Sequence, residues 1–234
     1  ITEMGKAVMS IGTSAAIRMT HHTPIPDVDT QLFNYILDEK HYVIGGPSNN
    51  GGVVYEWFQE TFGTIEAAAD LPIGSARLLF LPYLMGERAP VWNTDASAAF
   101  IGLRKLHTTA HLLQAALEGI ILNLYQIAQS LEQTETKIEE IYASGGFTKN
   151  ETAMQILADV FNAKVYLQTH QEGTALGAAI LGFQALGITV NTVLPEKASF
   201  SPNASAHQQY QALFEIWSNL YGQLKESFAA LRDF

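Results

Sequence analysis

Three glycine-rich turns carry the residues of this chain that could do chemistry. They are Gly12-Thr13-Ser14, Asn49-Asn50-Gly51-Gly52 and Ser144-Gly145-Gly146, and each stands at a boundary between apolar segments. Glycine lets a phosphate or a flat ring approach the backbone, because no Cβ blocks the way. Backbone N–H groups and the hydroxyls of Thr13 and Ser14 are donors that suit an anion. The turns therefore favour a phosphate-bearing ligand.

Each turn is weak support by itself, because most glycine-rich turns have no ligand. The three would gain weight if one α/β domain brought them together, since ligands bind outside the carboxyl ends of the strands. The second turn leads into an expected helix, whose first N–H groups and dipole also favour an anion. None of the turns matches the P-loop or dinucleotide fingerprints.

Other polar residues have structural interpretations that we favour over catalytic ones. Glu87 and Arg88 could be an active-site acid and its orienting partner, but a structural ion pair or a loop-capping pair is the favoured interpretation. Asp159 lies in a helical apolar pattern, which favours helix packing or capping. His21 and His22 are interpreted as surface histidines, because no cysteine or nearby carboxylate pair completes a metal-ligand set.

Composition limits the class of protein. The chain has 234 residues, of which 47% are hydrophobic, so it can bury the core of one large domain or two small ones. A net charge of −10 argues against non-specific nucleic-acid binding and requires backbone donors, helix N-termini or a metal ion to hold an anion. There is no cysteine, no run of ~18 apolar residues and no signal-peptide pattern at the start, which favours a cytoplasmic protein without a membrane span.

Strand and helix patterns alternate along the chain. Apolar runs between turn residues predict strands at 7–11, 15–19, 35–37, 41–44, 78–84, 138–143 and 164–167. Apolar residues at steps of three and four predict helices from 53, from 109, and at 150–161, 174–186 and 205–232. Residues 45–52 are expected to form turns and 188–204 a loop. The helix at 174–186 is rich in Ala and Gly and is expected to pack closely on a sheet. The order indicates an α/β domain built around one sheet.

One long segment resembles a known family. Ala98-Ala99-Phe100-Ile101-Gly102-Leu103, followed after seven residues by His111 to Glu118, is similar to the C-terminal signature of the FGGY carbohydrate kinases. Gly86 to Pro90, Ser144 to Gly146 and Glu172 to Ala179 resemble further blocks of that family in order. The resemblance implies the ribonuclease H-like fold shared with actin and hexokinase, a mixed sheet flanked by helices. It implies a core at about 1–188 and a C-terminal helical segment at about 205–232.

The resemblance also implies a reaction and a nucleotide site. Enzymes of this kind transfer the γ-phosphate of ATP to a sugar hydroxyl with Mg²⁺. Thr13, with Gly12 and Ser14 in the same turn, resembles the residue that meets the terminal phosphates. Gly52 looks like the glycine near the phosphates, and Glu56 stands where some members contact ATP through Gln. Gly145, Gly146 and Asn150 look like the group that holds the adenine end.

The chain departs from the family pattern at two places. The family often has Ala-Arg-Gly before the signature phenylalanine, where this chain has Ser97-Ala98-Ala99, so no contact of that arginine is carried over. The family's general base is an Asp shortly upstream of the Gly-Thr turn, but Ile1 to Ile11 contains Glu3 and no Asp. We therefore expect the base and an N-terminal sugar-binding domain to precede Ile1. The chain alone should have no catalytic residue and no metal ligand, and should phosphorylate nothing.

The choice of sugar is predicted from shorter stretches. Gly12 to Arg18, Asn49 to Gly52 and Ala89 to Asn93 are most similar to gluconate kinases, with xylulose kinases as the alternative. An actin-like nucleotide-binding module and a structural module without kinase activity remain alternatives from other classes. The expected partners are ATP or ADP, a sugar or sugar acid bound through the missing domain, and a second copy in a homodimer, with neither nucleic acid nor membrane.

Overall fold

A computed structural model describes residues 3–25, 31–64, 71–132, 137–168, 173–190 and 196–232. Its strands are β1 (Lys6–Ile11), β2 (Ala15–His21), β3 (Phe33–Ile36), β4 (Tyr42–Ser48), β5 (Leu79–Leu81), β6 (Ala99–Ile101), β7 (Glu140–Ser144), β8 (Lys164–Gln168) and β9 (Glu196–Phe200). Its helices are α1 (Gly52–Phe62), α2 (Thr109–Glu132), α3 (Glu151–Phe161), α4 (Gly173–Ala185), α5 (Ala204–Trp217) and α6 (Leu220–Arg232), with a short 3₁₀ turn at Gly146–Lys149.

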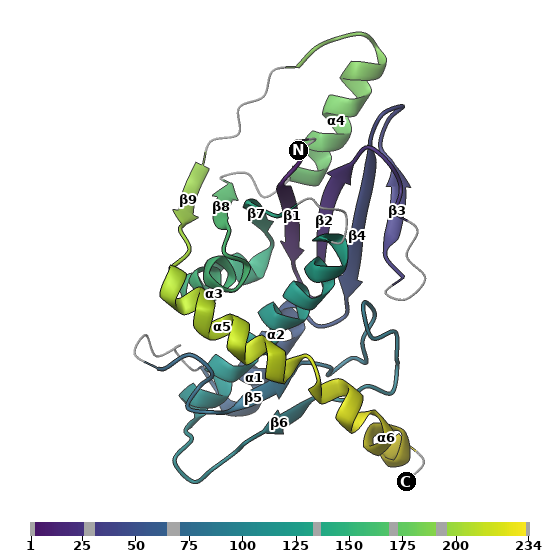
Figure 1. Cartoon of the computed structure of the whole chain (residues 1–234). Coiled ribbons are helices and arrows are strands. Elements are labelled where there is room, and N and C mark those ends of the chain that lie inside the picture. Colours follow the sequence, from purple (N-terminus) through teal and green to yellow (C-terminus); the bar gives the residue numbers. More distant parts are fainter. Residues whose placement is uncertain are drawn as a thin grey trace.

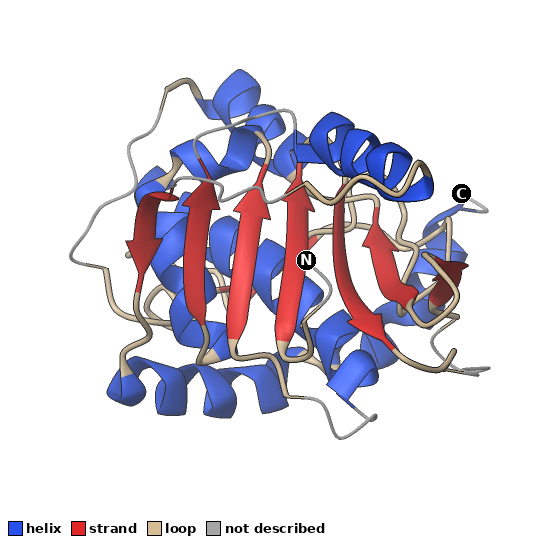
Figure 2. Cartoon of the chain, turned by 90° about the horizontal axis from the view of Figure 1, so that it is seen from above, coloured by secondary structure: helices blue, strands red, loops and turns tan. Residues whose placement is uncertain are grey.

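The main sheet has seven strands in the order β3-β4-β2-β1-β7-β8-β9. Strands β1, β2 and β4 pair antiparallel, whereas β7 and β8 continue parallel to β1. Short turns can join antiparallel neighbours, but the parallel pairs need crossovers, which α2 and α3 supply. Helix α4 lies on one side of this sheet and α2 and α3 lie on the other, so that helices flank both faces (Figures 1 and 2). The fold is therefore the expected mixed α/β, ribonuclease H-like type.

The core lies between the sheet and the long helix α2. Alternate residues of β1 are buried on this face, and α2 contributes a continuous stripe of fully buried residues that includes Leu117, Ile120 and Leu124. Glycine brings β4 close to this helix, because a Cβ at Gly46 would lie 2.3 Å from Cγ2 of Ile127. The turn expected from residue 45 is thus wrong for residues 45–48. These residues form the end of β4, and the glycines there serve close packing.

Three further boundaries differ from the sequence predictions. The loop expected at 188–204 contains β9, which pairs antiparallel with β8; residues 191–195 lie outside the described residues. The C-terminal helical segment is two helices that break at residues 218–219. The strand expected at 78–84 is reduced to β5, which pairs with β6 in a separate two-stranded sheet. All three differences depend on tertiary pairing that local periodicity does not record.

Helix α4 does not pack closely over its length, contrary to expectation. Leu181 is 40% exposed and Phe183 is 45% exposed, and most of the other described side chains of the helix are exposed as well. Close approach of small residues needs a facing surface, and the described chain supplies little of one here. Among the described helices, none is both long enough and apolar enough to cross a membrane.

Candidate functional site

The first two glycine-rich turns are bound to each other by backbone hydrogen bonds. The N–H of Gly52 donates to the carbonyl of Gly12 at 2.6 Å, and the N–H groups of Gly51 and Val53 donate to the carbonyl of Thr13 at 3.2 and 3.1 Å. A Cβ at Gly52 would lie 2.8 Å from the oxygen of Gly12, so this position requires glycine for the approach of the two chains. The loop between β4 and α1 is therefore fixed to the β1–β2 turn.

The third turn joins the same edge of the sheet. Parallel pairing of β1 and β7 sets Ser10 opposite Ser144, and the Ser144 hydroxyl donates to Ser10 Oγ at 3.4 Å. Gly145 has a φ of 101°, and a Cβ there would lie 2.2 Å from the oxygen of Ile11. Only glycine fits both constraints. The structure thus brings together the three turns that the sequence singled out.

Donors for an anion are available at the first turn. Gly12, Thr13 and Ser14 are exposed, and the N–H groups of Thr13 and Ser14 donate to no acceptor in the described part of the chain. The first N–H groups of α1 are different, because those of Gly52 and Val53 already donate to the first turn. Anion binding by the N-terminal N–H groups of α1, which the sequence favoured, is therefore limited by their use in holding the two turns together.

The residues predicted at the adenine end lie in open surroundings. A Cβ at Gly146 would meet no heavy atom within 4 Å. Asn150 is the N-cap of α3, where its Oδ1 accepts from the N–H of Ala153 at 3.0 Å, so it has a structural role independent of any ligand. Glu56 is exposed on α1 and forms no ion pair with another described residue.

A buried carboxylate supports the second turn from beneath. Oε1 of Glu87 accepts from the N–H groups of Asn49 (3.0 Å) and Arg88 (2.7 Å). Its Oε2 accepts from Ser48 Oγ (2.8 Å), Asn50 Nδ2 (2.9 Å) and Asn123 Nδ2 (3.0 Å). Burial raises the pKa of Glu87, and these donors oppose the rise. The loop-capping interpretation is confirmed, and no ion pair joins Glu87 to Arg88 among the described contacts.

Sequence reasoning missed Asn123 in this network. It is fully buried in the middle of α2 and connects the central helix to Glu87 and to Ser48, whose Oγ lies 3.2 Å from its Nδ2. The available signal was an amide inside the long apolar stripe of that helix. Asp159 has the expected helix-packing role, because its Oδ1 on α3 accepts from the N–H of Asn203, the N-cap residue of α5, at 2.8 Å and from Gln155 Nε2 at 2.9 Å.

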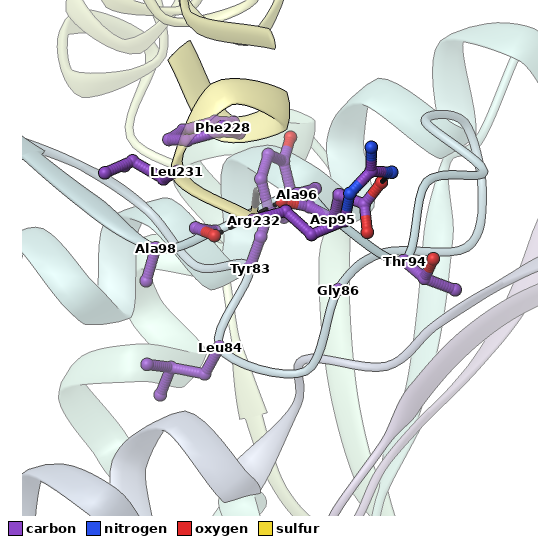
Figure 3. A pocket seen from close by; sticks show the side chains of 11 residues that line it. Tyr83, Leu84, Gly86, Thr94, Asp95, Ala96, Ala98, Phe228, Leu231 and Arg232 are labelled. Carbon is purple, nitrogen blue, oxygen red and sulfur yellow. Dashed lines mark hydrogen bonds and ion pairs between the residues drawn. The ribbon is translucent and has the colours of Figure 1, made fainter. Parts of the chain in front are cut away.

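Two hollows on the surface are relevant to the site. The larger, of about 500 Å³, lies between the segment from Tyr83 to Ala98 and helix α6, where Arg232 pairs with Asp95 at 2.7 Å (Figure 3). None of the three turns lines it. The smaller, of about 170 Å³, includes Ser14 of the first turn among its lining residues. No group of three or more His, Cys, Asp or Glu side chains among the described residues is placed to hold a metal ion.

Comparison with known proteins agrees with this geometry. The model of the FGGY family of carbohydrate kinases, C-terminal domain, matches residues 7–186. Gluconokinase of Bacillus subtilis is 36% identical over 98% of this chain and 49% of its own length, and xylulose kinase of the same species is 31% identical over 100% and 50%. The crystal structure of gluconate kinase from Lactobacillus acidophilus superposes with a TM-score of 0.89 at 34% identity, covering 97% of this chain and 49% of that one. The chain spans about half the length of the curated relatives that it matches.

Proposed function

This chain belongs to the FGGY family of carbohydrate kinases, and from that premise we propose that it is the nucleotide-binding half of an enzyme that transfers the γ-phosphate of ATP to a sugar hydroxyl. The observation that carries the proposal is the meeting of three glycine-rich turns at one edge of the sheet, with exposed donors on Thr13 and Ser14. Phosphoryl transfer requires little covalent chemistry from the protein, so positioning and charge stabilisation are its main needs.

The nucleotide contacts divide between the turns. Thr13, with Gly12 and Ser14, would hold the terminal phosphates through N–H and hydroxyl donors. Gly52 would bring α1 close to those phosphates, with Glu56 one turn further along the helix. Gly145, Gly146 and the amide nitrogen of Asn150 would hold the adenine end, where the lack of a side chain at Gly146 leaves room for a flat ring.

Magnesium and the general base need separate sources in this proposal. Mg²⁺ usually keeps several waters and is bound through substrate phosphates, so in this proposal the ion would be held mainly by nucleotide phosphates and water. When bound, the ion would neutralise charge on the phosphates. The general-base Asp and most of the sugar site would come from an N-terminal domain ahead of Ile1. The 234 residues alone would then bind nucleotide without phosphorylating a sugar.

Calorimetry with ADP and ATP, each with Mg²⁺, tests the nucleotide site. Gly146→Arg places a long side chain at the proposed adenine surface, where its Cβ meets no protein atom within 4 Å, and we expect ADP affinity to fall by about tenfold or more. The matched control is Gly222→Arg on α6, where an added Cβ also meets nothing within 4 Å. Its ADP affinity should stay within about twofold of the parent. Absence of ADP binding at millimolar concentration would favour the structural-module alternative.

Gluconate is the proposed sugar substrate, with xylulose as the alternative. The higher identity to gluconokinase than to xylulose kinase of the same species supports this order. Coupled measurement of ADP release, on the protein expressed from its complete gene, compares the two substrates. The 234-residue chain assayed in parallel should release no ADP with either sugar. Gluconate phosphorylation by that shorter chain would contradict the proposal that the base lies elsewhere.

A further inference from the structure

Two arginines meet at a small pocket on the face of the sheet that points away from α2. Seven residues line this pocket of about 170 Å³: Ser10, Ser14, Ala15, Ala16, Arg18, Pro47 and Arg88. They come from β1, the first glycine-rich turn, β2, β4 and the loop after Glu87. The pocket therefore directly adjoins the turn at which we propose that the terminal phosphates bind.

Strand register shows on which face the pocket lies. Met9 of β1 is opposite Ile17 of β2, and Ile17 is opposite Gly46 of β4, so these three face the same way. That face is the one toward α2, because a Cβ at Gly46 would touch Ile127. The neighbouring set points to the other face of the sheet and includes Ser10, which is opposite Ala16, and Arg18.

Neither guanidinium has an anionic partner. The described residues include no carboxylate within ion-pair distance of Arg18 or Arg88. Among the described residues, Arg18 donates a single long hydrogen bond of 3.4 Å to Ser10 Oγ, and it lies 5.9 Å from the ring centroid of Phe33. Arg88 donates from Nη2 to the carbonyl of Ser48 at 3.0 Å, while its buried Nε has no partner.

The missing partner is unexpected in so acidic a chain. The chain has 23 Asp and Glu residues and 13 Lys and Arg residues, so carboxylates are numerous enough to pair with every arginine. Burial lowers the pKa of Arg18, and the Tyr35 phenol opposes that shift. Removing a charge from water without a partner is costly, and an anionic ligand in the pocket would offset that cost.

We propose that Arg18 and Arg88 bind the carboxylate of a sugar acid, and that they thereby select an acid substrate over a neutral sugar. The inference rests on the proposed function, because it places the acceptor beside the phosphate-binding turn. A guanidinium presents a planar fork of N–H donors that can bind both oxygens of a carboxylate. A terminal CH₂OH group has one neutral oxygen and cannot make that paired contact. The hydroxyls of Ser10 and Ser14, on the pocket wall, suit the hydroxyl groups of the same ligand.

Phosphate is the competing anion, and two features favour the carboxylate. The exposed N–H donors of Thr13 and Ser14 already supply a phosphate site in the neighbouring turn. The arginines instead lie on β2 and on the loop after Glu87, outside that turn. Occupation of the pocket by a nucleotide phosphate remains a defined outcome of the test below.

Binding of a matched pair of ligands to the 234-residue chain is the first experiment. D-gluconate and D-glucitol have the same carbon skeleton and differ at C1, which is a carboxylate in one and CH₂OH in the other. With Mg·ADP present, NMR titration should give gluconate at least about tenfold tighter binding than glucitol, the discrimination expected for hydrogen bonds to a charged group. Equal binding of the two ligands, or binding of neither, would overturn the proposal.

Variants then locate the contact. Arg18→Gln and Arg88→Gln should each weaken gluconate about tenfold or more, with ADP affinity within about twofold of the parent. Arg18→Lys keeps the charge but loses the fork, so its affinity should lie between those of the parent and Arg18→Gln. Lys105→Gln removes one exposed positive charge elsewhere and should change neither ligand. Thermal unfolding of each variant identifies any loss that comes from misfolding.

The two proposals fail in different ways. If ADP binds and gluconate does not exceed glucitol, the nucleotide site stands and the carboxylate site is wrong. If both arginine variants weaken ADP as much as gluconate, the pocket holds a phosphate. In the protein expressed from its complete gene, Arg18→Gln should raise the KM for gluconate about tenfold or more while leaving the KM for ATP within about twofold. An unchanged KM for gluconate would overturn the assignment.

Discussion

Two buried glutamates, Glu87 and Glu118, show how differently the same group is used in two regions of this domain. They are 3% and 1% exposed, and burial raises the pKa of each, that of Glu118 to about 7. Glu87 accepts from five donors that approach both oxygens. Glu118 accepts on Oε1 from the N–H of Gly74, from Gln114 Nε2 and from the Tyr210 hydroxyl, while Oε2 has no hydrogen-bond partner in the described chain.

The difference follows from what each glutamate supports. A group surrounded by five donors must be an acceptor at both oxygens, and Glu87 thereby fixes the second glycine-rich turn, which is bound to the turn that we assign to the phosphates. Glu118 joins α2 to the segment near Gly74 and to α5, away from the three turns, and its unpartnered oxygen can carry a proton. Supporting the site thus requires a carboxylate, whereas supporting the C-terminal helices requires only one good acceptor.

The largest expected effect comes from the same substitution at both positions. Glu87→Gln turns an NH₂ group toward N–H and O–H donors, and we expect a loss of about 4 kcal/mol in the free energy of unfolding. Glu118→Gln keeps the acceptor on one side and should cost less than about 1 kcal/mol at pH 5, where Glu118 is protonated in the folded chain. Urea denaturation of the two variants measures the contrast. Equal losses would show that the two networks do not differ in this way.

The pH dependence of stability gives the next largest effect. The pKa of Glu118 is about 7 in the folded chain against an ordinary value of 4.5, so the folded state binds more protons between these values. The stability contributed by the protonated group is full below pH 4.5 and is lost as pH rises through 7. We expect a loss near 1.4 kcal/mol per pH unit within that window, or about 3 kcal/mol across it. Glu118→Gln should remove this slope in urea denaturation from pH 5 to 8, and a slope that persists would contradict it.

Asn50→Ala tests whether the Glu87 network couples stability to ligand binding. Asn50 donates from Nδ2 to the carbonyl of Gly86 at 2.7 Å and to Glu87, and its Oδ1 accepts from the N–H of Met85 at 3.1 Å. Losing these buried bonds should cost about 2 kcal/mol and loosen the second turn. Calorimetry should therefore also show weaker ADP binding. Weaker ADP binding by this variant would support the link between the Glu87 network and the nucleotide site. A destabilised variant with unchanged ADP affinity would contradict that link.

Tyr210→Phe should give a small effect, on the Glu118 network. It removes a 3.2 Å hydrogen bond to Glu118 and leaves the buried ring in place. We expect a loss of about 1 kcal/mol in unfolding free energy, with ADP affinity unchanged. A change in ADP affinity for this variant would mean that the C-terminal helices are coupled to the nucleotide site.

Prediction from the sequence succeeded where the determinants are local. The β1–β2 hairpin, α2 and α3 were recognisable from turn residues and apolar periodicity, and the resemblance indicated the family. Prediction failed at Gly45 to Ser48 and at β9. Glycine and proline have turn propensity in isolation, but in β4 they pair with β2, and β9 needs the edge of β8. Such pairings depend on distant segments, which periodicity cannot report.

The sequence by itself determined the three turns, the apolar faces and the family signature, because each depends on residue type and short spacing. Only the tertiary structure decided that α1 gives its first N–H groups to the first turn and that Glu87 is held by Ser48, Asn50 and Asn123. It also brought Arg18 and Arg88, 70 positions apart, to one pocket. Strand register and the path of the loop after Glu87 fix that meeting, and neither is encoded in the residues near either arginine.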